Sequence, residues 1–404
     1  MSGNTFELEI TDIAFGGNGL GRKDGFVYFV AGTLPGELVL AEETSRKKNF
    51  GTARLVEILR SSQNRIPSAC PLAWAPCKNK EDAIGQCPGC SYQHVKYEEE
   101  VQIKNRHLGN FIKHNLKIDP AIVMDAPVPS PKDLNYRNKI VLHCSEDKLG
   151  YFADDNVTVV DVEKCPLAGT EINQKLAEVR TNLKKYSAAS DITFRSTAKN
   201  GVQFWVDNRS EGCVLEEKTS FGALEVPRGS FFQVNLKCAD LLAAEPVKMV
   251  KESKATKFAD LYCGCGFFSI AVAKSGIESV VGVDSDLETI KSAIKNAASF
   301  GLETTKCSFS AKSAEAYMTE NSRKLKTDET VLLLDPPRGG LSSKLKNQLV
   351  STGVKKIIYI SCAADMMARD MKLLCECGFK LKKIRLFDMF PRTSHFETIA
   401  YMEK

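Results

Sequence analysis

The sequence has no run of eighteen consecutive apolar residues, so it predicts no membrane-spanning helix. It also begins without the basic start and apolar core of a secretory signal, and we therefore expect a cytoplasmic protein. It contains no internal repeat of fixed period and no low-complexity tract. What remains, 43% hydrophobic and 26% charged residues, is the composition of a folded globular protein rather than a disordered one.

The charge is nearly balanced, since 55 basic and 50 acidic residues leave a net charge of +5. Such a weak excess permits nucleic-acid binding without indicating it. The 404 residues are enough for about two to four domains. Fourteen cysteines are many for a chain without an export signal. In a reducing compartment a cysteine cluster more often binds a metal or takes part in catalysis than forms disulfides.

Residues 1–60 predict a five-stranded β-barrel of the oligonucleotide-binding type. The glycine-rich segment 16–21 allows two interpretations, a phosphate-binding loop or a turn of the barrel. Because it does not lie between a strand and a helix, we interpret it as a barrel turn. Strand-like runs separated by glycine and proline turns cover residues 6–10, 26–30, 37–41 and 51–59.

Two further regions follow the barrel. Residues 61–238 begin with a cysteine-containing loop, continue with a charged helix over 97–116, and then alternate strands with one helix over 171–185, which predicts an α+β domain. From 239 to 404, short apolar strands alternate with helical segments. Continuous apolar strands between helices predict a parallel sheet with both faces covered.

A glycine-containing segment, 260–268, lies directly after one of these strands and opens a helix. Gly264 and Gly266 let the backbone turn tightly and approach a ligand at the helix N-terminus. The next strand ends at Asp284, whose carboxylate can accept hydrogen bonds from both ribose hydroxyls of an adenosine. Ser269 replaces the third glycine of the dinucleotide fingerprint, which argues against a dinucleotide fold; a purely structural turn remains an alternative. The segment resembles motif I of class I S-adenosylmethionine-dependent methyltransferases.

Three polar segments follow the later strands: Asp-Pro-Pro-Arg from Asp335, Ser-Cys ending at Cys362, and Asp-Met-Phe-Pro-Arg-Thr-Ser-His-Phe-Glu ending at Glu397. Taken singly, Asp335 could cap a turn, Cys362 could be an inert cysteine and Glu397 could be a solvated residue. Ligands bind at the carboxyl ends of strands in open α/β sheets, so the three together favour one active site beside the cofactor turn.

This set of motifs resembles the RNA 5-methyluridine methyltransferase family, and the likeness covers essentially the whole chain. Residues 1–59 resemble the TRAM barrel of its ribosomal-RNA members. The resemblance implies a class I methyltransferase domain with a seven-stranded sheet at 239–404 and an iron–sulfur central domain at 61–238. It implies methyl transfer from S-adenosylmethionine to carbon 5 of a uridine in RNA, with 23S rRNA as the expected substrate and a monomer as the expected state.

The residue types suit that reaction. Carbon 5 of uracil is a poor nucleophile, and addition of a thiolate to carbon 6 would activate it, which assigns Cys362 as the nucleophile. A base must then remove the proton on carbon 5, which assigns Glu397. The expected cofactor contacts are Gln233, Tyr262, Gly264, Gly266, Asp284, Ser313 and Asp335. The expected RNA contacts are Phe231, Gln233, Arg137 and Asp335.

Two positions, Phe267 and Ser313, depart from the family pattern, and a third, Phe232, allows a second interpretation. Phe267 stands where relatives carry a polar residue, and Ser313 stands near a position where they carry an amide or acid that contacts adenine. Both departures concern the detail of cofactor binding. Phe231 is expected to contact RNA, whereas Phe232 could equally pack at a domain interface.

Five cysteines point to a metal site. Cys87 and Cys90 enclose a tight Cys-Pro-Gly-Cys turn, a spacing that binds either zinc or an iron–sulfur cluster. By resemblance, a [4Fe–4S] cluster is held by Cys70, Cys87, Cys90 and Cys165. The sixteen residues between Cys70 and Cys87 form a longer spacer than the family pattern, so Cys77 could replace Cys70. Free thiols and a local zinc site remain alternatives. The chain lacks the cysteine signature of radical enzymes, so we expect a structural or RNA-positioning cluster.

Three other functions remain open. The chain could methylate a uridine in transfer RNA instead, or it could methylate a nitrogen, a reaction that Asp-Pro-Pro would allow and that does not need Cys362. It could also be a non-catalytic RNA-binding factor, although Cys362 and Glu397 argue against this.

Overall fold

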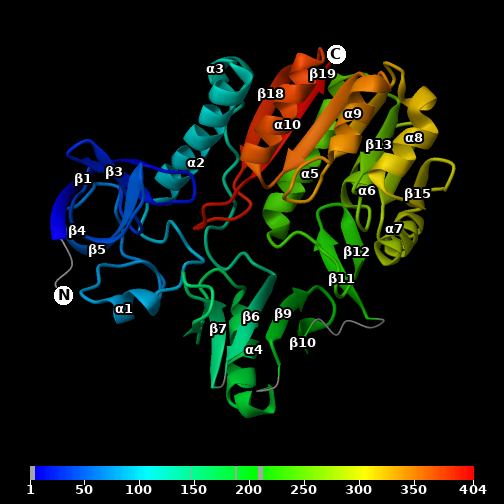
Figure 1. Ribbon diagram of the computed structural model, residues 1–404. Helices are drawn as coiled ribbons and strands as arrows, with labels where there is room; N and C mark the ends of the chain where they lie inside the picture. Colours follow the sequence, from blue (N-terminus) through cyan, green and yellow to red (C-terminus); the bar gives the residue numbers. More distant parts are fainter. Residues whose placement is uncertain (1–4, 146, 187–188, 208–212) are drawn as a thin grey trace.

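The computed structural model shows three sheet-containing parts that follow one another along the chain (Figure 1). A closed barrel is followed by a five-stranded sheet and then by a seven-stranded sheet that carries most of the helices. No helix of the described residues is long and apolar enough to cross a bilayer. The structure describes residues 5–145, 147–186, 189–207 and 213–404.

The N-terminal barrel is closed in the order β1-β2-β3-β5-β4, which confirms the predicted five strands. Gly16 and Gly17 lie in the β1–β2 turn with φ of 106° and 96°, a backbone conformation that favours glycine. Inward-facing apolar side chains such as Leu8, Val39 and Leu55 fill the barrel. The strands are β1 (Thr5–Ile13), β2 (Gly19–Lys23), β3 (Phe26–Val30), β4 (Leu38–Arg46) and β5 (Phe50–Arg60).

A helical connection lies between the barrel and the largest sheet (Figure 1). Helix α2 (Tyr97–Phe111) continues as a π-helical turn, η1 (Ile112–Leu116), so the helix predicted over 97–116 is confirmed. The short helices α1 (Lys80–Ile84) and α3 (Pro120–Val123) flank it. The chain after α3 then pairs with the edge strand of the large sheet.

The second part is an antiparallel sheet in the order β10-β9-β6-β7-β8, with helix α4 (Thr170–Arg180) packed against it. A separate hairpin of β11 (Val214–Thr219) and β12 (Gly222–Pro227) leads toward the last part. A 3-10 turn, η2 (Leu183–Tyr186), follows α4. The sheet strands are β6 (Lys139–Ser145), β7 (Lys148–Phe152), β8 (Val159–Asp161), β9 (Asp191–Thr197) and β10 (Gly201–Val206).

The third part is a seven-stranded sheet in the order β15-β14-β13-β16-β17-β19-β18. The first five strands are parallel, as predicted, but β19 runs antiparallel to both neighbours. The reason is its connection: a loop joins β18 to β19, whereas a parallel neighbour needs a crossover such as a helix. The strands are β13 (Lys257–Leu261), β14 (Ser279–Asp284), β15 (Cys307–Ala311), β16 (Thr330–Leu334), β17 (Lys356–Ser361), β18 (Lys380–Phe387) and β19 (Glu397–Glu403).

Helices cover both faces of this sheet and create two apolar cores. One core contains Met318, Leu345 and Met371 from α8, α9 and α10, together with the end of α2. The other contains side chains of α5, α6 and α7. Residue 239, where the sequence predicts the last domain to begin, lies inside α5. The helices are α5 (Leu236–Glu252), α6 (Phe267–Lys274), α7 (Leu287–Ser299), α8 (Ala314–Leu325), α9 (Ser343–Ser351) and α10 (Ala364–Glu376).

Candidate active site

The turn between β13 and α6 has the geometry of a cofactor-binding loop. Tyr262 and Cys263 donate their N–H groups to the Val283 carbonyl oxygen of the neighbouring strand, at 2.8 and 3.0 Å. Gly264 and Gly266 have φ of 52° and 89°. A Cβ on Gly264 would meet no atom within 4 Å, so this side of the turn is open. The turn therefore presents free space directly before the N-terminus of α6.

Asp284 closes the turn from the adjacent strand. Its Oδ2 accepts a hydrogen bond from the Gly264 N–H at 3.0 Å, and its Oδ1 accepts one from the Asp286 N–H at 2.9 Å. A carboxylate has about four acceptor positions, so two remain for ribose hydroxyls. The predicted pairing of the glycine turn with this acid is thus a direct contact.

Position 269, where the dinucleotide fingerprint has its third glycine, has a structural role that no sequence motif indicates. The Ser269 hydroxyl, on α6, donates to Asp260 Oδ2 at 2.6 Å, and both side chains are fully buried. Burial raises the pKa of Asp260 to about 7. This pair ties α6 to β13 beneath the turn.

Phe267 and Ser313, the two departures from the family pattern, also have local roles. Phe267 is buried, and its ring centroid lies 5.6 Å from that of Phe232. Ser313 caps helix α8 by accepting a hydrogen bond from the Ala316 N–H at 3.2 Å, and its side chain is exposed. Phe267 therefore belongs to the core, whereas the Ser313 hydroxyl is at the surface, where it also donates to the Glu315 carboxylate and lowers its pKa.

Cys362 and Glu397 lie beside each other at one edge of the sheet. Strand β17 ends at Ser361, which pairs with Thr398 of β19, so Cys362, the first residue after β17, follows directly where Glu397 begins β19. The Thr398 hydroxyl fixes this register by donating to the Ser361 carbonyl oxygen at 2.9 Å. Asp335 follows β16, the other neighbour of β17. The structure thus brings together the three residues that the sequence places at separate strand ends.

The surroundings of Cys362, Glu397 and Asp335 favour the protonated, uncharged form of each group. Burial and then the charge of Glu397 raise the pKa of the Cys362 thiol to about 11, although Arg338, which hydrogen-bonds the thiol, acts in the opposite direction. Burial also raises the pKa of Glu397 well above its usual range, and the charge of Asp335 adds to the effect. Burial and the charge of Asp260 raise the pKa of Asp335 as well. Arg338 is therefore the cation of the site; it stands in the Asp-Pro-Pro-Arg motif but was not singled out from the sequence.

Buried charges hold the loop of residues 388–396, which leads to Glu397. Lys104 Nζ, from α2, lies 2.7 Å from both Glu100 Oε1 and Asp388 Oδ1 and donates to the Phe390 carbonyl oxygen at 3.2 Å. The three charged side chains have no exposed surface. No local pattern indicates this cluster, because Asp388 lies 284 positions after Lys104 along the chain.

Arg392 fixes the same loop from a second direction. Its φ of 68° is in the left-handed region, which an arginine adopts only when its surroundings hold it there. Its backbone N–H donates to Glu100 Oε1 at 2.6 Å, and its guanidinium donates to the Val95 carbonyl oxygen at 2.7 Å and pairs with Asp133. Its carbonyl oxygen accepts from the Tyr92 N–H at 3.0 Å. The segment that follows the barrel is thereby fastened to the loop before the predicted base.

The residues expected to contact RNA differ in exposure. The Phe231 side chain is 75% exposed, whereas Phe232 is buried. Gln233 is also buried, and its carbonyl oxygen accepts from Asn138 Nδ2 at 3.3 Å. Arg137 Nε donates to the hydroxyl of the neighbouring tyrosine at 3.3 Å. An aromatic ring exposed to this degree is available for stacking on a base.

Four of the five cysteines line one small cavity. Cys70, Cys87, Cys90 and Cys165 surround a cavity of about 70 Å³ with apolar neighbours. Cys77 lies elsewhere, because its thiol points to the Leu55 carbonyl oxygen of the barrel at 3.9 Å. Burial raises the pKa of Cys87 to about 11 and that of Cys90 to about 12. Within the described residues no three His, Cys, Asp or Glu side chains are arranged as a metal-binding group, so a cluster is not shown.

Comparison with known proteins follows the same division of the chain. A family model described as TRAM domain matches residues 1–56, and one described as tRNA (Uracil-5-)-methyltransferase matches residues 169–404. The chain is 27% identical to the 23S rRNA (uracil(1939)-C(5))-methyltransferase RlmD of Shewanella sediminis, over 98% of this chain and 95% of that protein. It is 28% identical to the tRNA (uracil(54)-C(5))-methyltransferase of Schizosaccharomyces pombe, over 98% and 78% of the two chains.

A solved structure has the same fold. The tRNA (uracil-54, C5)-methyltransferase of Pyrococcus abyssi, in complex with S-adenosyl-L-homocysteine, superposes with a TM-score of 0.73 at 23% identity, over 98% of this chain and 100% of that one. The family model covers more than half of the 404 residues. The chain belongs to the tRNA (uracil-5-)-methyltransferase family and is an S-adenosylmethionine-dependent RNA uracil-C5 methyltransferase with an N-terminal TRAM domain.

Proposed function

We propose that this enzyme methylates its target uridine through a covalent adduct at Cys362. The thiolate adds to carbon 6 of uracil, and the ring electrons move toward carbon 5 and the carbonyl oxygen. Carbon 5 then takes the methyl group that S-adenosylmethionine supplies. Glu397 removes the proton on carbon 5, the carbon 5–carbon 6 double bond forms again, and the thiolate leaves.

One observation carries this mechanism. Cys362 and Glu397 stand at adjacent positions of paired strands, beside Asp335 at the end of the next strand. The proposed nucleophile and base thus lie together at the same edge of the sheet. Arg338 supports the thiolate, because its positive charge opposes the effect of burial on the pKa of Cys362.

A trapping experiment tests the adduct. RNA that contains 5-fluorouridine cannot lose a proton from carbon 5 after methyl transfer, so the wild-type protein should remain bound covalently in the presence of S-adenosylmethionine. Cys362→Ala should form no adduct and no 5-methyluridine. Cys375→Ala, which alters another half-buried thiol, is the matched control and should behave as wild type. An adduct that persists in Cys362→Ala would refute the mechanism.

We assign the methyl donor to the open side of the β13–α6 turn. The ribose hydroxyls of its adenosine would donate hydrogen bonds to the free acceptor positions of Asp284, and Tyr262, Gly264 and Gly266 would line its path. Ser313 can donate its hydroxyl proton toward adenine, and Gln233 and Asp335 would contact both the donor and the uracil. Phe231 and Arg137 would contact the RNA around the target, which must be unstacked to reach the site.

We propose 23S rRNA as the substrate. The N-terminal barrel and the similarity to proteins named as 23S rRNA methyltransferases support this choice. The similarity to tRNA methyltransferases makes transfer RNA the alternative. Mapping 5-methyluridine in both RNAs from cells with and without the gene decides between them: the nucleotide lost from 23S rRNA supports the proposal, and one lost only from tRNA refutes it.

We further propose that Cys70, Cys87, Cys90 and Cys165 hold a [4Fe–4S] cluster. Four sulfur donors around one small cavity fit such a group, and Cys77 points away from it. A bound cluster would join the loop after the barrel to the central sheet. Iron and acid-labile sulfide content test the assignment without reference to activity. Cys70→Ser should lose the cluster and Cys77→Ser should retain it; the reverse result would refute the assignment.

A further inference from the structure

A pocket with three lysines at its rim opens beside the predicted uracil site. It has a volume of about 320 Å³ and lies between the central sheet, the β11–β12 hairpin and the start of α5. This size is at the lower end of the range of about 300–1,000 Å³ for small-molecule pockets. It therefore suits one small group such as a single nucleotide and is too small for a helical segment of nucleic acid.

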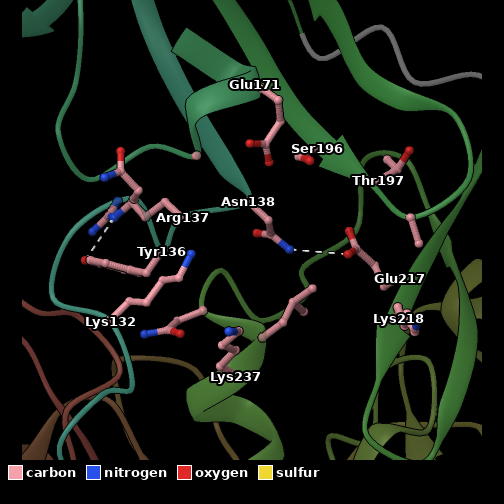
Figure 2. Close-up of a pocket in the computed structure, with 15 residues that line it drawn as sticks. Lys132, Tyr136, Arg137, Asn138, Glu171, Ser196, Thr197, Glu217, Lys218 and Lys237 are labelled. Carbon is pink, nitrogen blue, oxygen red and sulfur yellow. Dashed lines mark hydrogen bonds between the residues drawn. The ribbon is translucent and has the colours of Figure 1, made fainter. Parts of the chain in front are cut away.

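The floor of this lysine-rimmed pocket is polar and buried. Asn138, Glu217 and Asn235 are each less than 10% exposed. Glu217 Oε1 accepts from Arg195 Nε at 2.7 Å, and its Oε2 accepts from Asn138 Nδ2 at 3.3 Å (Figure 2). Because Arg195 balances its charge, Glu217 serves as a fixed acceptor for further donors rather than as an uncompensated anion.

The rim carries the positive charge. Lys132, Lys218 and Lys237 line the pocket and are exposed. Over the described parts of the chain none of their ammonium groups forms a direct ion pair, whereas many other lysines do, Lys291 with Glu288 at 2.6 Å among them. The charge of Lys132 does lower the pKa of Glu171, a carboxylate that also lines the pocket. Figure 2 shows Lys132 and Lys237 on one side of the hollow. Unpaired lysines around a polar floor are suited to phosphate oxygens.

Hydrogen bonds connect the floor of the pocket to segments of the candidate active site. Asn138 Nδ2, on its floor, also donates to the Gln233 carbonyl oxygen at 3.3 Å. Asn235 Nδ2 donates to the Met389 carbonyl oxygen at 3.2 Å, in the loop that leads to Glu397. The two amides thus bind the Phe231–Gln233 segment and the loop before the predicted base.

From this arrangement we infer that the pocket binds an unstacked nucleotide of the substrate RNA next to the target uridine. The inference rests on the proposed function. The lysines neutralise its flanking phosphates, and the base edge reaches the floor, where Glu217 accepts a hydrogen bond from an exocyclic amino group. The enzyme then holds two bases out of the stack, the target at Cys362 and its neighbour here. The second base supplies specificity that the uracil itself cannot.

Binding of RNA as a function of salt tests the rim. For a short labelled single-stranded RNA of mixed sequence, Lys132→Ala/Lys237→Ala should lower the slope of log K against log salt by about 1.4, or about 0.7 per lost contact. The matched control is Lys251→Ala/Lys372→Ala, two exposed lysines outside the pocket, and its slope should equal that of wild type. KM for RNA should rise in the pocket variant while kcat at saturating RNA stays constant. Equal slopes in both variants would overturn the inference.

Crosslinking separates this inference from the proposed function. RNA carrying 6-thioguanosine, a photoreactive base that keeps an exocyclic amino group, beside the target uridine should crosslink to peptides that contain residues 132–138, 217–218 or 235–237. Inorganic phosphate at the concentration of the RNA phosphates should not suppress the crosslink; suppression would show a simple anion site and overturn the inference. A wild-type protein that methylates uridine but crosslinks elsewhere also refutes the pocket alone. One that crosslinks here but never methylates refutes the proposed function alone.

Discussion

The turn after β13 and the loop after β18 both bring chemistry to the same edge of the sheet, but they are held in different ways. The first is short, depends on two glycines with positive φ, and is fixed by the adjacent strand through Val283 and Asp284. The second is longer and is fixed by buried charges from α2 and by backbone contacts from the segment after the barrel.

The turn and the loop therefore depend on different parts of the chain for their conformation. The turn needs only its own sequence and the strand beside it, so changes there should affect ligand binding more than folding. The loop needs three distant parts of the chain in place before Glu397 is positioned. Changes to its partners should therefore lower stability and activity together.

The largest effect should come from Lys104→Met. It leaves Glu100 and Asp388 buried without their cation, and breaking a buried ion pair from one side costs about 3–5 kcal/mol. Chemical unfolding followed by circular dichroism measures the loss. Lys291→Met, which removes an exposed pair with Glu288, is the control and should change stability by less than about 0.5 kcal/mol. If both variants lost the same free energy of unfolding, the buried charges would not hold the loop more strongly than an exposed ion pair holds a helix.

Asp284→Ala tests the turn. Loss of the predicted ribose contacts should weaken binding of S-adenosylhomocysteine by about 10- to 100-fold, at about 1.4 kcal/mol per tenfold. Isothermal titration calorimetry measures the change. Asp286→Ala removes the cap of α7 without touching the turn glycines and should leave the affinity near that of wild type. If Asp284→Ala instead lowers stability without altering affinity, the turn depends on its contacts for folding in the same way as the loop does.

Arg338→Gln tests the electrostatics at the shared edge of the sheet through the pH dependence of adduct formation. The reactive thiolate of Cys362 exists above the pKa of its thiol, which is raised to about 11 because burial outweighs the opposing charge of Arg338. Without the guanidinium this pKa rises, so the rate of adduct formation should need a pH higher by about one unit and fall about tenfold at neutral pH. Arg338→Lys keeps the positive charge and should shift the profile less. A profile unchanged in Arg338→Gln would show that the thiol does not sense this charge.

Ser313→Ala should have the smallest effect. Loss of the α8 cap costs about 1 kcal/mol of stability, and loss of one hydroxyl donor to adenine weakens cofactor binding by about three- to tenfold. Ser313→Asp retains a capping acceptor but has no proton to donate when it is charged, so it separates the two contributions. An affinity unchanged in both variants would restrict Ser313 to the helix cap.

Much of the fold follows from local pattern. The barrel strands, the helix over 97–116 and the parallel strands were predictable, because apolar periodicity and glycine turns act over a few residues. The antiparallel β19 was not, since strand direction depends on whether a loop or a helix forms the connection. Arg338 was visible in its motif but had no assigned role until the structure placed it against Cys362.

The sequence by itself indicated the family and the glycine turn, and it predicted Cys362 and Glu397 as reactive residues and a cysteine site with Cys70 or Cys77 among its members, because each belongs to a short motif with its own chemistry. Only the tertiary structure decided that Cys77 points away from the cysteine cavity, that Lys104 and Arg392 hold the loop before Glu397, and that three unpaired lysines surround one pocket. The physical reason is that burial and charge pairing are set by residues far apart along the chain, and no local pattern records which of them will meet.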